Sequence, residues 1–277
     1  MPYGVPVSFL RKFLSVEMLL RDMLYVSYFI PSARISPFLP PALKPATVGG
    51  NNVFVTLVIF RGKTSGVATI PTPRIPFNQV NIRTYVIDPV SGKPSVYFVH
   101  CGINSGLITF LYRILSGMPV QHTSFRIDPV KGNEADYSHY KVSGKWNGKF
   151  IVEAKEISPA LITLSPFLNV QEAIDYLVDP LVGFYTDGGI LRRLEVYHDP
   201  LVPRVFTPSK ILFPYLSKLD IVPEEEITQP HNVLLVPFTS FFIYLPARAY
   251  AQWSVAENSR KHLSGFFLEF AIKLRGN

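Results

Sequence analysis

Short stretches dominated by β-branched and aromatic residues recur along the chain, separated by turn residues. This spacing, with Gly, Pro, Asn and Asp between the stretches, predicts an antiparallel barrel or sandwich of many short strands. The predicted strands cover residues 25–30, 53–60, 80–87, 96–101, 122–127, 137–142, 150–154, 191–197 and 234–245. Between two of them, Asn147-Gly148 predicts a hairpin turn.

Two segments follow a helical period instead. In residues 105–116 the apolar positions recur at spacings of three and four, and Gly117 then favours a stop. A second helix is expected over residues 170–178, with Asn169 as its N-cap. The tail, residues 247–277, predicts a further helix and a last strand.

Charged residues interrupt the apolar stretch near the N-terminus. The largely apolar residues 8–30 are broken by five of them: Arg11, Lys12, Glu17, Arg21 and Asp22. This excludes an uninterrupted signal or membrane-spanning run. We expect residues 1–24 to form an amphipathic segment packed on a single domain of residues 25–277.

Composition narrows the class of protein. Of the 277 residues, 48% are hydrophobic and 17% are charged, which is ample material for a core. The net charge of +7 is spread along the chain without a basic block, which argues against nucleic acid as a partner. A diffuse positive field could attract an anionic metabolite, although it could also serve solubility alone. The single cysteine, Cys101, forms no internal disulfide, so we expect a cytoplasmic protein.

Several longer blocks resemble the acetoacetate decarboxylase superfamily, and in particular its large uncharacterised branch. The blocks are residues 35–45 followed by 53–60, 77–86 (Phe-Asn-Gln-Val-Asn-Ile-Arg-Thr-Tyr-Val), 96–98, 112–119 and 184–200. The resemblance implies a mainly β (α+β) fold: an antiparallel, cone-shaped β-barrel with a few helices. It also implies an internal small-molecule pocket, in proteins that often form oligomers.

The chain departs from that family at its catalytic lysines. In true acetoacetate decarboxylases, a lysine that follows the proline after the family helix forms a Schiff base with the substrate. Here those positions hold Val120 and Gln121, which cannot form an imine. The nearest lysines, Lys63, Lys93 and Lys131, lie in turn-like polar surroundings and are expected to be solvated.

A polar face marks the predicted strand over residues 78–87. Alternation places Gln79, Asn81, Arg83 and Tyr85 on one side of this strand. The pattern alone favours contact with water, whereas the resemblance implies that this face lines the pocket and binds the ligand. The uncharacterised branch commonly has a glutamate where this chain has Gln79.

Three histidines could act as an acid or a base near neutral pH. His198 lies in a block that matches the family and is the first catalytic candidate, and His122, just beyond the missing lysines, is the second. For each, and for His100, a structural role is the alternative. No zinc-binding spacing, phosphate loop or dinucleotide fingerprint occurs, so we expect neither a metal nor a cofactor.

These observations lead to an expected function with two alternatives. The first is a cofactor-free, lyase-like enzyme that acts on a small oxo or carboxylic compound without a lysine Schiff base. The second is a non-catalytic binding protein or sensor for a hydrophobic small molecule. The third, a membrane-surface protein that uses residues 1–24, is less favoured because such segments more often pack on a core. The expected ligand is anionic and partly apolar.

Overall fold

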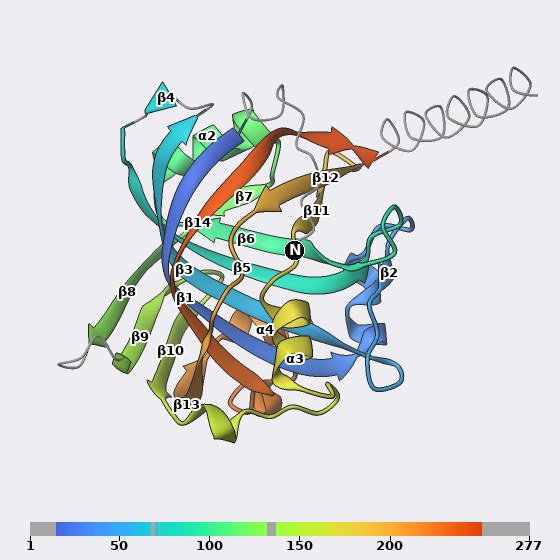
Figure 1. Cartoon of the computed structure of the whole chain (residues 1–277), viewed down its shortest axis with the longest axis vertical. Coiled ribbons are helices and arrows are strands. Elements are labelled where there is room, and N and C mark those ends of the chain that lie inside the picture. The colour runs from blue at the N-terminus through green and yellow to red at the C-terminus, as the bar shows by residue number, and fades with distance from the viewer. Residues whose placement is uncertain (1–14, 68–69, 72, 132–136, 251–277) are drawn as a thin grey trace, which may run out of the picture.

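A closed ring of seven strands forms the centre of the fold (Figure 1). The computed structural model describes residues 15–67, 70–71, 73–131 and 137–250. In ring order, the strands are β1 (Ser15–Pro31), β3 (Asn52–Val67), β5 (Pro76–Ile87), β6 (Pro94–Ile103), β11 (Val182–Asp187), β12 (Ile190–Tyr197) and β14 (Asn232–Ala249). Strand β14 pairs with β1 and closes the ring. The neighbours are antiparallel except β6 and β11, which run parallel.

Strand β1 begins earlier than the sequence predicted. Residues 15–24, expected in a separate amphipathic segment, are part of this ring strand and pair with both β3 and β14. The register shifts between Arg21 and Leu24, and Asp22 adopts a positive φ of 52°. The carboxylate of the buried Asp22 accepts hydrogen bonds from Arg61 of β3 and Tyr137 of β9. A strand with such a bulge breaks the alternation that a sequence pattern shows. Residues 1–14 lie outside the described part of the chain.

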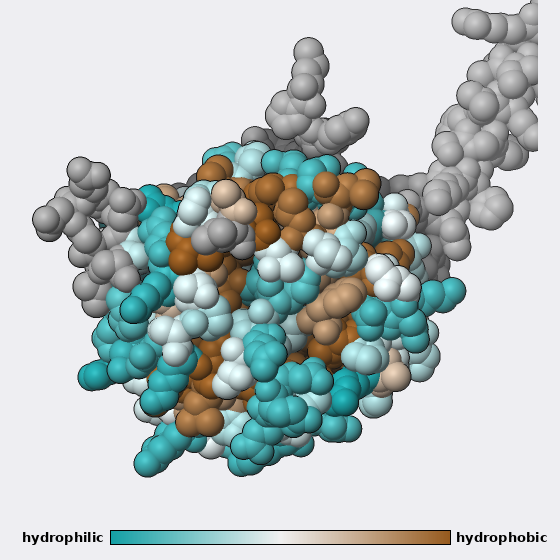
Figure 2. Space-filling model, turned by 90° about the horizontal axis from the view of Figure 1, so that it is seen from below, coloured by the Kyte–Doolittle hydropathy of each residue, from teal (hydrophilic) through white to brown (hydrophobic). Residues whose placement is uncertain are grey.

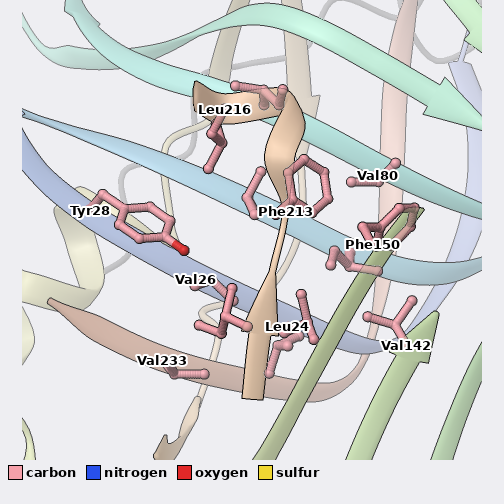
Figure 3. Packing of buried hydrophobic residues seen from close by; sticks show 14 of the residues in the cluster. Leu24, Val26, Tyr28, Val80, Val142, Phe150, Phe213, Leu216 and Val233 are labelled. Atoms are coloured by element: carbon pink, nitrogen blue, oxygen red, sulfur yellow. The ribbon is translucent and has the colours of Figure 1, made fainter. Parts of the chain in front are cut away.

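The same sheet continues beyond the ring and forms a second layer that packs against its outside. It continues from β14 through β13 (Arg204–Leu212), β10 (Lys149–Glu156) and β9 (Tyr137–Lys145) to β8 (Ser124–Lys131). Figure 3 shows the apolar core between the two layers, where Leu24 and Val26 of β1 meet Val142 of β9 and Phe150 of β10. Leu216 of the short helix α4 (Pro214–Lys218) joins this core.

The inside of the ring holds a second core, on the opposite face of the same strands. Along β1, Leu24 and Val26 face the outer core, while Met23 and Tyr25 face the interior. Helix α2 (Gly106–Ser116) and helix α3 (Val170–Leu177) both pack side chains into the interior. In Figure 1, α2 lies at the upper end of the ring and α3 lies at the lower right.

The predicted helix boundaries are confirmed. The Asn169 side chain caps α3 by accepting a hydrogen bond from the Glu172 backbone N–H at 2.9 Å. Gly117 ends α2 with a φ of 71°, a conformation that glycine adopts without steric cost. The hairpin turn at Asn147-Gly148 is also confirmed, between β9 and β10.

Short elements complete the fold. They are β2 (Lys44–Pro45), β4 (Ile70–Pro71), β7 (Val120–His122) and 3-10 turns at Ser32–Arg34, Ser36–Phe38, Pro159–Leu161 and Glu224–Glu226. The strand predicted over residues 122–127 is divided between β7 and β8. Strands β11 and β13 were not predicted, and most of the predicted tail, residues 251–277, lies outside the described residues.

The surface mixes polar and apolar residues. On the face seen from below, hydrophilic residues cover much of the surface, with apolar residues between them (Figure 2). Within the described ranges, no helix combines the length and the apolar character needed to cross a bilayer.

Candidate functional site

The polar face of β5 points into the ring. Gln79, Asn81 and Arg83 are 4%, 5% and 9% exposed, and Tyr85 is fully buried. The residues between them, such as Val80, face the outer core instead. The structure therefore brings all four predicted ligand-binding residues to the interior, on one face of one strand. The Gln79 amide donates to Asn81 Oδ1 at 2.7 Å.

A directed chain of hydrogen bonds fixes the middle of this face. Tyr85 donates its hydroxyl to the backbone oxygen of Leu177 at 2.7 Å. Its oxygen lies 3.0 Å from Thr56 Oγ1, which lies 2.9 Å from Ser27 Oγ. Since the Tyr85 proton is committed to a carbonyl, Thr56 must donate to Tyr85 and Ser27 must donate to Thr56. The chain holds Tyr85 rigidly beside the end of α3.

Arg83 lies at the same helix end. Its Nη2 donates to the Leu177 oxygen at 2.6 Å, where the carbonyl end of α3 favours a positive charge. The guanidinium also lies over the rings of Tyr25 and Tyr85, 5.2 and 5.6 Å from their centroids. Among the described residues, no carboxylate forms an ion pair with Arg83, and its Nε has no hydrogen-bond partner.

His198 follows β12 directly and is 5% exposed. Its Nδ1 lies 2.9 Å from the Asp199 carbonyl oxygen and 3.4 Å from Asp179 Oδ1. A carbonyl can only accept, so Nδ1 carries the proton and Nε2 of the neutral ring presents a lone pair. That Nε2 is buried and has no partner in the described part of the chain.

Burial and neighbouring charges shift the pKa values of His198 and Asp179. Burial lowers the pKa of His198, and the Arg83 charge lowers it further, against the opposing effects of the Asp199 carbonyl and Asp179. The ring is therefore neutral at pH 7. Burial raises the pKa of Asp179, although the nearby His198 opposes that shift. We call Tyr25, Arg83, Tyr85, Asp179 and His198 the polar cluster.

Several buried polar atoms of the polar cluster have no hydrogen-bond partner among the described residues. Besides Arg83 Nε and His198 Nε2, Asp179 Oδ1 makes no hydrogen bond to the described residues, and neither does Gln79 Oε1 further along β5. Buried polar atoms in folded proteins are nearly always paired, so a group of exceptions in one interior marks a place where polar ligand atoms can bind. A guanidinium N–H and a histidine lone pair are suited to an anion that exchanges a proton.

An apolar cavity of about 330 Å³, partly open to solvent, lies beneath α2 at one end of the ring. Its walls include Met18 of β1, Ile108 and Tyr112 of α2, Leu194 of β12 and Ile243 of β14. The family resemblance implies an internal pocket, but no local pattern indicates these walls, because they come from segments that are far apart along the chain.

The other sequence candidates lie elsewhere. His122 is exposed on β7, so the structure does not bring this second catalytic candidate to the polar cluster. The His100 ring packs against the ring of Tyr215, a residue of the outer core, with 5.4 Å between the centroids. Val120 is buried, and Gln121 accepts a hydrogen bond from Trp146 at 2.8 Å.

No lysine whose side chain the structure describes is buried. Lys63 and Lys93 are both exposed, in agreement with their predicted solvation, and the side chain of Lys131 lies outside the described residues. The part of the chain that the structure covers also holds no group of three His, Cys, Asp or Glu residues placed to bind a metal.

Sequence reasoning missed Asp179, Tyr25 and the Leu177 carbonyl. Asp179 precedes a proline at the end of α3, where an acidic residue has an ordinary turn-forming role. Only the packing of α3 against the ring brings it to His198.

Solved structures with the same fold include three enzymes. An acetoacetate decarboxylase-like enzyme from Sphingomonas wittichii RW1 superposes with a TM-score of 0.56 at 10% identity, over 86% of this chain and 93% of that one. Acetoacetate decarboxylase from Legionella pneumophila gives 0.52 at 9%, over 84% and 86%. The enduracididine biosynthesis enzyme MppR, complexed with pyruvate, gives 0.51 at 13%, over 84% and 90%.

Among curated proteins, none matches this chain in sequence. A family model described as an uncharacterised conserved protein does match, over residues 17–232. Together with the structural neighbours, it confirms the resemblance and the predicted barrel. The chain belongs to the DUF2071 family and has the fold of the acetoacetate decarboxylase-like proteins.

Proposed function

We propose that the barrel interior binds a small oxo or carboxylic acid, with Arg83 holding its anionic oxygens and His198 exchanging a proton with it. The observation that carries this proposal is the pair of buried nitrogens without partners, Arg83 Nε and His198 Nε2. A neutral imidazole with a depressed pKa is a competent base at pH 7, and a guanidinium stabilises an oxyanion.

The chemistry that fits is carbon-acid chemistry without a cofactor. His198 Nε2 takes a proton from the carbon beside the carbonyl, the electron pair of that C–H bond forms a C=C bond, and the π pair of the carbonyl moves to its oxygen. Arg83 stabilises the resulting enolate, and returning the proton from His198 regenerates the base. The proposed route needs no imine; it is supported by Val120 and Gln121, which the family resemblance places at the lysine positions, and by the exposure of the described lysine side chains.

A non-catalytic binding protein for a hydrophobic molecule is the second candidate. The apolar cavity favours it, because binding pockets are mostly apolar with a few polar groups that orient the ligand. Turnover separates the two proposals. In D₂O, we expect the protein to exchange the methyl protons of pyruvate for deuterium, as followed by NMR, and His198→Gln to abolish the exchange. Binding without exchange supports the second candidate.

Calorimetric titration with pyruvate and acetoacetate tests the role of Arg83. Charge-assisted hydrogen bonds contribute about 1.5 to 3 kcal/mol each, so we expect Arg83→Leu to bind at least about tenfold more weakly. Arg83→Lys keeps the charge but loses the planar fork, and should bind with intermediate affinity. The matched control is Arg126→Leu, which removes an arginine that is 76% exposed. Equal affinity in Arg83→Leu and the parent contradicts the proposal. If the leucine variant does not fold, the lysine variant carries the same comparison.

A further inference from the structure

The described lining of the cavity beneath α2 is almost entirely apolar. Three hydroxyls are among its lining residues, and each is already hydrogen-bonded within the protein. Thr64 donates to the Pro73 carbonyl at 2.8 Å, Ser116 to the Tyr112 carbonyl at 2.7 Å, and Tyr112 to Met18 Sδ at 3.1 Å. The part of a ligand that enters here has no polar partner and must itself be apolar.

The cavity lies close to the polar cluster along two strands. On β14, Ile243 lines the cavity, and Phe241, two residues away on the same face, packs its ring 4.4 Å from the His198 ring. On β12, Leu194 lines the cavity, and Val196 on the same face packs into the interior core just before His198. Two residues of a strand span about 7 Å, so the cavity and the His198 ring are separated by no more than the length of a medium-chain acid.

The cavity volume limits the length of the apolar part. At about 30 Å³ for each water-sized group, 330 Å³ holds roughly ten methylene-sized groups. Pyruvate or acetoacetate alone leaves nearly all of this space unused.

We infer that the natural ligand is a medium-chain aliphatic acid or oxo acid, with its carboxylate at Arg83 and its chain in the cavity beneath α2. The inference rests on the proposed function and adds the substrate class. The polar cluster selects the acid group, and the cavity selects the chain.

Calorimetric titration with unbranched saturated acids from four to fourteen carbons, below their micelle concentrations, tests this inference. The transfer free energy of one methylene predicts a gain in affinity of up to about fourfold per added carbon. The gain should end when the cavity is full, at about ten to twelve carbons in total. Affinity that does not change with chain length contradicts the inference.

Two variants test whether the aliphatic chain of the ligand lies in the cavity. Leu115 lines the cavity but is 52% exposed, so Leu115→Trp adds bulk with little strain, and Ile108→Phe adds bulk from the buried side. Both variants should bind decanoic acid at least tenfold more weakly than the parent does, and should bind butanoic acid with the affinity of the parent. Ile114→Trp is the matched control, because Ile114 is on the same helix, is 63% exposed and is not among the lining residues. Decanoic acid bound equally by the parent and both cavity variants contradicts the assignment.

The outcomes separate this inference from the proposed function. If Arg83→Leu weakens every acid but chain length has no effect, the proposed function stands and the inference fails. If Arg83→Leu binds every acid as the parent does, the proposed site itself is wrong. A parent protein that binds none of the acids contradicts both.

Discussion

Asp88 and Arg193 form a buried ion pair that joins two strands that are not neighbours in the ring. Arg193 Nη2 lies 2.9 Å from Asp88 Oδ2, and Asp88 follows β5 while Arg193 belongs to β12. Asp88 also accepts hydrogen bonds from the Ser91 hydroxyl and the Val90 backbone N–H. Burial alone would raise the pKa of Asp88, but these hydrogen bonds, with that from Arg193 the strongest, lower it.

Removing the charge of Asp88 should destabilise the protein at neutral pH. Breaking one partner of a buried pair typically costs about 3 to 5 kcal/mol, so we expect Asp88→Asn to lower the free energy of unfolding by about that much at pH 7. Because the folded pKa lies below the ordinary aspartate value of 3.8, the parent loses this contribution as the pH falls through the folded pKa. Urea unfolding should therefore show the difference shrinking below pH 3.8. Asp128→Asn, at a surface pair, should change little, and a constant Asp88→Asn difference at all pH values would contradict the assignment.

His198 should make the folded protein sensitive to mild acid. Its pKa is lowered in the fold, so between that pKa and about 6.5 the unfolded chain binds more protons than the folded one. Stability therefore falls as the pH drops through 6.5. In His198→Gln this contribution is gone, and the melting temperature should fall less between pH 7.5 and 5.5 than in the parent. His122→Gln, at an exposed position, is the control and should behave as the parent does. If the melting temperature falls equally in His198→Gln and in the parent, the His198 ring is not the buried neutral group described above.

No imine with acetoacetate is expected. Borohydride reduction in the presence of acetoacetate, followed by intact-mass analysis, should leave the protein mass unchanged, because no described lysine side chain lies in the interior. A true acetoacetate decarboxylase treated in parallel should gain the mass of the reduced adduct. A stable adduct on one lysine of this chain would overturn the expectation and locate the reactive amine.

Gly144 should tolerate no side chain. A Cβ added there would lie 2.2 Å from Phe125 Cβ and 2.3 Å from the Ser124 carbonyl oxygen, on the neighbouring strand β8. The backbone oxygen cannot move without breaking the pairing, so Gly144→Ala should lower the free energy of unfolding by about 1 to 3 kcal/mol or more. Gly106→Ala, where a Cβ meets nothing within 4 Å, is the control in the same urea titration. Equal stability of both variants would show that β8 and β9 adjust freely.

The sequence correctly predicted the elements that are encoded by residues close together along the chain. Alternation located β5 and its polar face, and the residue types at Asn169 and Gly117 marked two helix ends. Strand β13 was missed because its centre, Thr207-Pro208-Ser209, reads as a turn, and β11 because it is short and contains Gly183. In the structure Gly183 lies against the Phe98 ring, which a Cβ would approach within 2.7 Å.

The polar cluster was only half predictable. Alternation put Arg83 and Tyr85 on one face, but the pattern alone assigned that face to water, and only the family resemblance turned it inward. The contact between Asp179 and His198, and the cavity under α2, depend on tertiary packing that no local pattern encodes.

The pairing of β1 with β14 also constrains how the chain can fold as it is synthesised. Strand β1 leaves the ribosome before the other described strands and can pair with β3 as soon as β3 is made, but its other edge stays open until β14, the last described strand, is made. Pairings between such distant segments slow folding, and an open edge can recruit strands of other chains. Strand β14 also pairs with β12 and β13, so its arrival covers three open edges together. A nascent chain that stalls before β14 therefore leaves the edges of β1, β12 and β13 open to pairing with other chains.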